Sequence, residues 1–260
     1  MTLRALAGRL APQALKDALD RRATGRFLDT VTPLTRDFVS RHGLTVLRGP
    51  FAGLQLDEQM VGVSGDLVAK LLGTYERELR PAFAEWIRAA PRHVVDVGSA
   101  EGYYAVGLAH AIPGATVLAF DIDPAARERC QALAARNGVA DRVDVREECT
   151  PEVLGELPAQ GVVLLSDCEG CEQALLDPAR QPLLRGWPII VELHDFIDPS
   201  ISSRLRERFE DSHEIELITE HSVDEREVPE LAHLNPDERD LLLSENRPTT
   251  MSWFCMRPRE

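Results

Sequence analysis

Glycines and acidic side chains recur at one kind of place in this sequence, directly after short apolar runs. Gly98 and Gly102 follow the run HVVDV and precede a helical pattern. Glycines there let the chain turn tightly and bring free backbone N–H groups close to a ligand. Asp121 follows the run ATVLAF, 23 residues after Gly98. Because an acid about 20 residues after such a loop commonly binds a ribose, the spacing predicts a ribose-binding site.

The glycine loop differs from the loop of dinucleotide-binding proteins. Those proteins carry G-x-G-x-x-G and place a pyrophosphate at the start of the helix. This loop is G-x-x-x-G, with Ala100 at its middle position and Glu101 beside it. The carboxylate of Glu101 would repel a pyrophosphate. The loop therefore disfavours a nicotinamide-dependent oxidoreductase, which stays an alternative.

Further polar residues follow the third, fourth and fifth strand-like runs. They are Glu147, Glu148 and Cys149, then Asp167, Cys168, Glu169, Cys171 and Glu172, and then Glu192, His194 and Asp195. Ligands of open α/β sheets bind beyond the carboxyl ends of the strands, so we expect these side chains to form one site. Asp123 precedes Pro124 and is expected to cap a helix instead.

The elements that must position these residues begin at Arg92, where strand-like and helix-like runs start to alternate. Seven strand-like runs occupy residues 93–97, 115–120, 142–146, 161–166, 188–193, 214–218 and 252–256. Near-continuous apolar strands alternating with helices predict an α/β fold, a Rossmann-like, mostly parallel seven-stranded sheet with helices on both faces. Residues 91–260 would form this domain. Residues 1–90 are expected to form an N-terminal helical cap or substrate lid, with helices at 14–22 and 34–42.

Composition excludes several functional classes. The 260 residues carry 29 Lys+Arg against 43 Asp+Glu, a formal charge of −14, which argues against a nucleic-acid partner. No apolar run approaches the ~18 residues of a membrane span, and the N-terminus lacks the apolar core of a secretory signal. Five cysteines are few and odd in number, so a disulfide framework is not expected. These features predict a cytoplasmic protein.

Two groups of motifs resemble a known family. The stretch VVDVGSAEGYYAVGLA, followed by VLAFDIDP and RNGV, resembles the opening motifs of class I S-adenosylmethionine-dependent methyltransferases. The segments DCEGCEQALLDP and PIIVELHDF resemble the FkbM-type branch, in which D-x-E-G-x-E follows the fourth strand. The resemblance covers roughly residues 92–256. Ala100 replaces the usual middle glycine, a change that is tolerated if its backbone angles are ordinary.

The resemblance implies a cofactor site for S-adenosylmethionine. Its expected residues are Asp96, Gly98, Ser99, Ala100, Glu101, Gly102, Tyr103, Asp121, Ile122, Glu148, Cys149 and Asp167. Residues 98–102 would pass beneath the methionine part with Asp96 supporting them, and one of the two tyrosines that follow would flank it. Asp121 would bind the ribose, and Glu148 and Cys149 would lie near the adenine. Carboxylates at this edge suit the cofactor, because its sulfonium and ammonium groups are positively charged.

The expected activity is methylation of a hydroxyl on a small molecule or a sugar. His194 is the predicted general base, assisted by Asp167 and Glu192, because an imidazole titrates near neutral pH. An alternative is a Mg²⁺ ion held by Asp167, Glu169, Glu192 or Asp195. A non-catalytic cofactor-binding protein is a further alternative. The sequence identifies no acceptor and leaves a homodimer open.

The pair Cys168 and Cys171 forms a C-x-x-C motif. Such a pair can form a redox couple or half of a zinc site. A structural zinc site needs two more ligands, and no second C-x-x-C occurs. We therefore expect two small buried thiols.

Overall fold

The fold is a seven-stranded sheet, seen in a computed structural model that describes residues 13–63, 65–245, 247 and 249–259. The strand order is β3-β2-β1-β4-β5-β7-β6. Strands β1 to β5 are parallel, and β7 runs antiparallel to both β5 and β6. This arrangement is Rossmann-like and mostly parallel, as predicted. The strands are β1 His93–Val97, β2 Thr116–Phe120, β3 Val143–Arg146, β4 Val162–Ser166, β5 Ile189–Glu192, β6 His213–Thr219 and β7 Ser252–Pro258.

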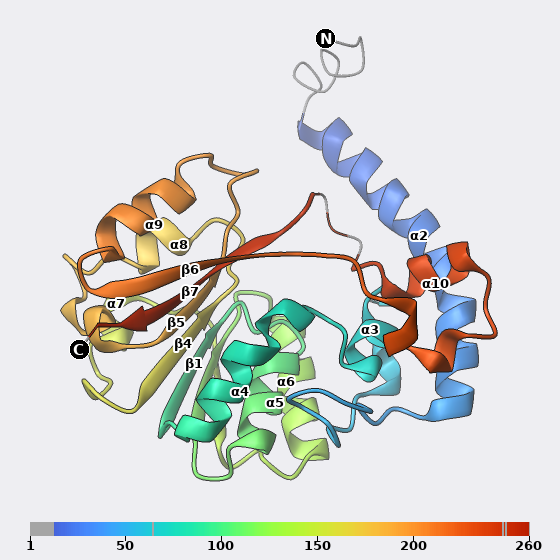
Figure 1. Ribbon diagram of the computed structural model, residues 1–260, viewed down its shortest axis with the longest axis horizontal. Coiled ribbons are helices and arrows are strands. Elements are labelled where there is room, and N and C mark those ends of the chain that lie inside the picture. Colours follow the sequence, from blue (N-terminus) through green and yellow to red (C-terminus); the bar gives the residue numbers. More distant parts are fainter. Residues whose placement is uncertain (1–12, 64, 246, 248, 260) are drawn as a thin grey trace.

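Helices cover both faces of the sheet, which confirms the predicted layers (Figure 1). One face carries α4 Arg80–Ala89, α5 Tyr103–Ala111 and α6 Pro124–Arg136, and the other carries α7 Pro151–Leu154, α8 Glu172–Leu175 and α9 Ile201–Phe209. Val94 and Val95 of β1 belong to two different apolar clusters, one on each face. The alternation follows because successive strand residues point to opposite faces.

The N-terminal segment packs with a part of the chain near the C-terminus. Helix α10 (Pro236–Leu243) contacts both α2 (Gln13–His42) and α3 (Leu67–Leu72) (Figure 1). The prediction of two separate helices within residues 14–42 is wrong, because α2 continues through Pro33. Val31 and Phe38, seven residues apart on one face of α2, are both buried, and this packing holds the helix across the proline. Residues 1–12 lie outside the described part of the chain, and a boundary at residue 90 stays a prediction.

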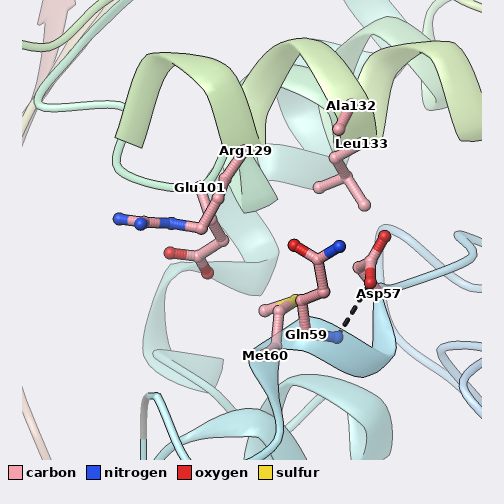
Figure 2. Close-up of a pocket in the computed structure, with 7 residues that line it drawn as sticks. All are labelled: Asp57, Gln59, Met60, Glu101, Arg129, Ala132 and Leu133. Carbon is pink, nitrogen blue, oxygen red and sulfur yellow. Dashed lines mark hydrogen bonds between the residues drawn. The ribbon is translucent and has the colours of Figure 1, made fainter. Parts of the chain in front are cut away.

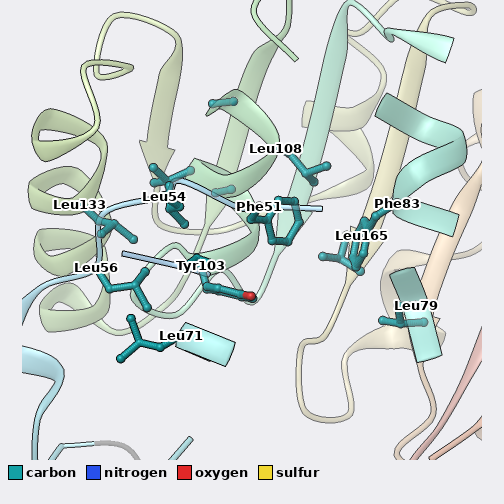
Figure 3. Packing of buried hydrophobic residues seen from close by; sticks show 14 of the residues in the cluster. Phe51, Leu54, Leu56, Leu71, Leu79, Phe83, Tyr103, Leu108, Leu133 and Leu165 are labelled. Atoms are coloured by element: carbon teal, nitrogen blue, oxygen red, sulfur yellow. The ribbon is translucent and has the colours of Figure 1, made fainter. Parts of the chain in front are cut away.

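Aromatic packing fixes the N-terminal segment onto α5 (Figure 3). The ring of Phe51 lies 5.4 Å from that of Tyr103 and 5.5 Å from that of Phe83. Phe51 also fills the space over Gly107 of α5, where a Cβ atom would meet its ring at 2.7 Å. This contact matters for function because α5 begins directly after the glycine loop.

Short 3₁₀ helices complete the described chain. They are η1 Glu58–Met60, η2 Arg77–Leu79, η3 Pro182–Gly186, η4 Glu225–Glu227 and η5 Pro229–Leu231. Among the described residues, no helix is both long and apolar enough to cross a membrane.

Candidate active site

A pocket of about 350 Å³ opens where β1, β2, β3 and β4 end. Its lining residues are the last residues of β1 and β2 and residues of the segments that follow the four strands: Val97, Gly98, Ala100, Phe120, Asp121, Ile122, Glu147, Glu148, Cys149, Asp167, Cys168, Glu169 and Cys171. Five of them are carboxylates, and no lysine or arginine is among these described lining residues. The pocket is therefore suited to a positively charged ligand.

The glycine loop turns so closely against the segment after β4 that a side chain has no room. Gly98 has φ of +86°, and a Cβ atom there would lie 1.6 Å from the carbonyl oxygen of Asp167. Ala100 has φ of +47°, in the left-handed region, so the condition under which alanine would replace glycine without strain is not met. The turn requires this conformation because it lets the Ala100 N–H donate to Asp121 Oδ2 at 2.8 Å.

Asp121 lies at the pocket wall and organises the loop around it. Its Oδ2 accepts from Ala100, and its Oδ1 accepts from the N–H of Asp123 at 2.8 Å. Each oxygen keeps a second lone pair for a ligand hydroxyl. Ile122 stands 79% exposed beside it. Asp123 caps α6 by accepting from the N–H of Ala125, which confirms its predicted structural role.

Two buried polar groups lie behind the glycine loop. Burial raises the pKa of Asp96 to about 7, although its carboxylate accepts a hydrogen bond from the backbone of Ala105. Its Oδ2 and the hydroxyl of Ser99 are buried and have no hydrogen-bond partner among the described residues. Neither residue lines the pocket, so any contact with a cofactor passes through the loop.

Glu101 and Tyr103 point away from the pocket, contrary to the expected contacts. Glu101 forms an ion pair with the buried Lys70 of α3 and lines a separate cavity of about 20 Å³ beside Arg129 (Figure 2). Such a cavity holds about one water molecule. Tyr103 packs its ring 5.7 Å from that of Tyr75, and Tyr104 stacks on Phe83. Both helical tyrosines therefore belong to the packing between cap and sheet.

A buried cluster of acids surrounds His194, which is only 2% exposed. Its Nδ1 lies 2.6 Å from Glu172 Oε1, and its Nε2 lies 3.3 Å from Glu192 Oε2 and 3.5 Å from Asp167 Oδ1. Asp167 belongs to this cluster and also lines the pocket. It therefore connects the cluster to the pocket.

The surroundings of His194 oppose its predicted role as a base. Burial alone would lower its pKa, but the hydrogen bonds to Glu172 and Glu192 outweigh burial and raise the pKa to about 10. The ring is then charged at neutral pH and has no free nitrogen to accept a proton. The pKa of Glu192 is shifted in the opposite direction, in part by the same contact with His194. Burial would raise its pKa, but hydrogen bonds from His194 and Asp167 lower it to about 2.

Arg247 is a further member of the site that sequence reasoning missed. Its guanidinium forms ion pairs with Glu76, Glu192 and Glu245, and it is nearly buried. Glu76 also accepts from the hydroxyl of Tyr104. Arg247 and Glu76 are 171 residues apart and neither follows a strand of the parallel part of the sheet, so no local pattern marked them.

Asp167, Glu192 and His194 are the one group in the described part of the chain whose ligand atoms lie close enough for a metal ion. The other two candidates are elsewhere: Glu169 is exposed, and Asp195 accepts from the N–H of Ser202 at 2.9 Å. The group does not fit Mg²⁺, which prefers oxygen ligands. Arg247 already neutralises Glu192, and the ring of His194 lies between the two acids.

Cys168 and Cys171 form a disulfide, so the expectation of two thiols is wrong. Glu169 and Gly170 between them have φ of +55° and +108°, and this tight turn brings the two Cα atoms to 5.5 Å. That distance lies within the range a disulfide spans. Sequence spacing did not decide the pairing, because C-x-x-C is compatible with free thiols, a metal or a bridge.

Solved structures of methyltransferases are among those that match the chain, at low identity and with TM-scores under 0.5. A putative precorrin-6Y C5,15-methyltransferase domain from Corynebacterium diphtheriae is 15% identical, with 72% of this chain and 99% of that chain covered and a TM-score of 0.43. The O-methyltransferase TomG from Streptomyces achromogenes, in complex with S-adenosylmethionine, is 12% identical, with 72% and 89% covered and a TM-score of 0.45. An O-methyltransferase from Bacillus cereus, in complex with S-adenosylhomocysteine, is 12% identical, with 98% and 96% covered and a TM-score of 0.45. No protein-family model and no curated protein matches the sequence.

Proposed function

We propose that the chain is an S-adenosylmethionine-dependent methyltransferase that methylates a hydroxyl of a small molecule or a sugar. One observation carries the proposal: the pocket beyond the parallel strands is lined by five carboxylates and, among its described lining residues, by no lysine or arginine. The sulfonium and ammonium of S-adenosylmethionine are attracted by such a lining. The pyrophosphate of a nicotinamide dinucleotide would be repelled, which disfavours the oxidoreductase alternative.

The lining residues divide between the parts of the cofactor. The segment from Gly98 to Ala100 would hold the methionine part, and Asp121 would accept hydrogen bonds from the ribose hydroxyls. Glu148 and Cys149 would border the adenine. Asp167 would stand at the reacting end, because it joins the pocket to the buried cluster.

When bound, S-adenosylmethionine would supply the methyl carbon on its sulfonium: the acceptor oxygen would bond to that carbon as its bond to sulfur breaks, and S-adenosylhomocysteine would leave. The residues of the chain align the acceptor with the methyl carbon and remove the hydroxyl proton. We assign the removal of this hydroxyl proton to the carboxylate of Asp167. Burial and the neighbouring Glu192 raise the pKa of Asp167, so its carboxylate is a stronger base once it has lost its own proton, and turnover should rise with pH as Asp167 ionises. His194, charged and held by Glu172, would position the two acids rather than accept the proton.

The subtype and the cellular setting are parts of the same proposal. The D-x-E-G-x-E segment supports an FkbM-type enzyme, because its first acid lines the pocket and its last acid, Glu172, holds His194. The charge of −14 supports a small acceptor over nucleic acid. A cytoplasmic location and a homodimer stay predictions from the sequence.

Calorimetric titration with S-adenosylmethionine and S-adenosylhomocysteine tests the cofactor assignment. Asp121→Ala removes the acceptor of two charge-assisted hydrogen bonds, so we expect affinity to fall at least ~10-fold. The matched control is Asp123→Ser, which removes the neighbouring carboxylate and keeps a helix cap; its affinity should stay within about 2-fold.

Unchanged affinity of the Asp121→Ala variant, or tight binding of NADH to the wild type, would overturn the assignment. Release of S-adenosylhomocysteine in the presence of candidate hydroxyl acceptors separates an enzyme from a non-catalytic binding protein. Asp167→Asn should then slow turnover by about 10²–10⁴-fold while cofactor binding survives.

A further inference from the structure

The Cys168–Cys171 disulfide closes a tight loop between two residues of the site. Asp167 precedes the loop and lines the pocket, and Glu172 follows it. Glu172 Oε1 accepts from Gly170 inside the loop at 3.2 Å and lies 2.6 Å from His194 Nδ1. Both bridged cysteines line the pocket. The bridge therefore ties the pocket wall to the acid–histidine cluster.

Besides the bridge, the loop is held by the Gly170 N–H on Glu172, by a contact of Ser166 Oγ with Cys168 Sγ and by packing of both cysteines against an apolar cluster. Its internal backbone hydrogen bond, from Cys171 N to Cys168 O, is long at 3.4 Å. Glu169 is exposed and adopts φ of +55°, a conformation that is unfavourable for a residue with a Cβ atom. Without the covalent bridge, Glu169 can return to ordinary backbone angles, and the wall between Asp167 and Glu172 loses its fixed shape.

The other three cysteines are free thiols, and two of them, Cys130 and Cys255, are buried away from the bridge. Cys149 lines the same pocket, but burial raises its pKa to about 12, so it supplies almost no thiolate to attack the bridge. Opening the bridge then needs an external reductant. In compartments whose thiols are kept reduced, disulfides are commonly transient and redox-sensing.

We propose that Cys168 and Cys171 form a redox latch on the cofactor pocket. The disulfide holds the wall in the shape that binds S-adenosylmethionine, and reduction releases the loop and weakens binding. The step is a thiol–disulfide exchange in which a dithiol gives two electrons and two protons to the two sulfurs and becomes a disulfide itself. The ligand in this inference rests on the proposed function, whereas the release of the loop does not.

The test compares the oxidised protein with the protein reduced by dithiothreitol. Thiol titration should count three thiols in the first state and five in the second. Hydrogen exchange of the backbone amides of residues 168–171 should quicken on reduction. The affinity for S-adenosylhomocysteine should fall about 10-fold, because the loop must then be ordered on binding.

Two variants make the test specific. Cys168→Ser combined with Cys171→Ser should show the low affinity with or without dithiothreitol. Cys149→Ser changes a thiol of the same pocket but keeps the bridge, so its oxidised and reduced forms should still differ about 10-fold.

Equal affinity of the two redox states, or a double-serine variant that binds like the oxidised wild type, overturns the latch. Unchanged exchange at residues 168–171 also overturns it. Should neither state bind the nucleoside, the proposed function fails, and the exchange measurement alone then decides whether reduction frees the loop.

Discussion

The two halves of the site are built by different means. In the half formed after β1 and β2, backbone groups hold the segments together: the Ala100 N–H donates to Asp121, which lies 21 residues further along the chain. In the half formed after β4 and β5, side-chain ion pairs join segments as far apart as Glu76 and Arg247, which are separated by 171 residues. A pocket wall can thus be encoded by residues close together in the sequence, whereas the charged cluster beside it exists only in the folded chain.

The largest effect is expected from removing the cation of the charged half. Arg247→Ala leaves Glu76, Glu192 and Glu245 buried without their shared partner. Breaking a buried ion pair costs about 3–5 kcal/mol, which urea denaturation would measure. Arg257→Ala is the control, because its pairs with Glu85 and Glu216 are partly exposed and should cost under about 1 kcal/mol. Equal losses in the two variants would contradict the comparison.

The backbone-built half should be most sensitive at Gly98. A Cβ atom there meets the Asp167 carbonyl, and φ is positive, so Gly98→Ala should cost about 3 kcal/mol and abolish cofactor binding. Gly114→Ala introduces the same methyl group where nothing lies within 4 Å and should be nearly neutral. Thermal unfolding and calorimetry on both variants give the comparison. A well-bound cofactor in Gly98→Ala would show that the loop moves freely.

The charged half should also respond to pH through His194. Its pKa is about 10 in the folded protein against 6.5 in the unfolded chain, so its contribution is complete below pH 6.5 and is lost as pH rises toward 10. Compared with His194→Gln, the wild type should be about 2–3 kcal/mol more stable at pH 6, with the difference shrinking by pH 10. Denaturation at both pH values checks this. A difference that grows with pH would mean that the ring is neutral in the folded state.

The smallest effect is expected at Ala100. Because its φ is positive, Ala100→Gly relieves an unfavourable conformation and should leave the protein equally stable or up to about 1 kcal/mol more stable. Ala132→Gly, on the exposed side of α6, should instead lose about 1 kcal/mol. The two substitutions are chemically identical, so opposite signs in thermal unfolding would isolate the effect of the backbone angle. The same sign in both would contradict it.

Strand and helix positions followed closely from local pattern. The predicted strand at residues 93–97 matches β1 in full, and the helical pattern that follows Gly102 in the sequence is α5. Asp123 was recognised as a cap because an acid before a proline carries that role locally. The predictions that failed concern side chains whose surroundings are set by the fold rather than by neighbouring residues in the sequence. The charge of His194, the direction of Glu101 and the bridging of Cys168 to Cys171 each depend on what the fold places nearby.

The sequence by itself determined the α/β sheet, the glycine loop and the acids that follow each strand, because apolar periodicity and turn chemistry act over a few residues. Only the tertiary structure decided which of those acids meet. It joined Asp167 to Glu192 and His194, brought Arg247 from the far end of the chain, and turned Glu101 toward Lys70. The physical reason is that a buried charge must find a partner wherever the fold provides one, and the distance along the chain does not limit that choice.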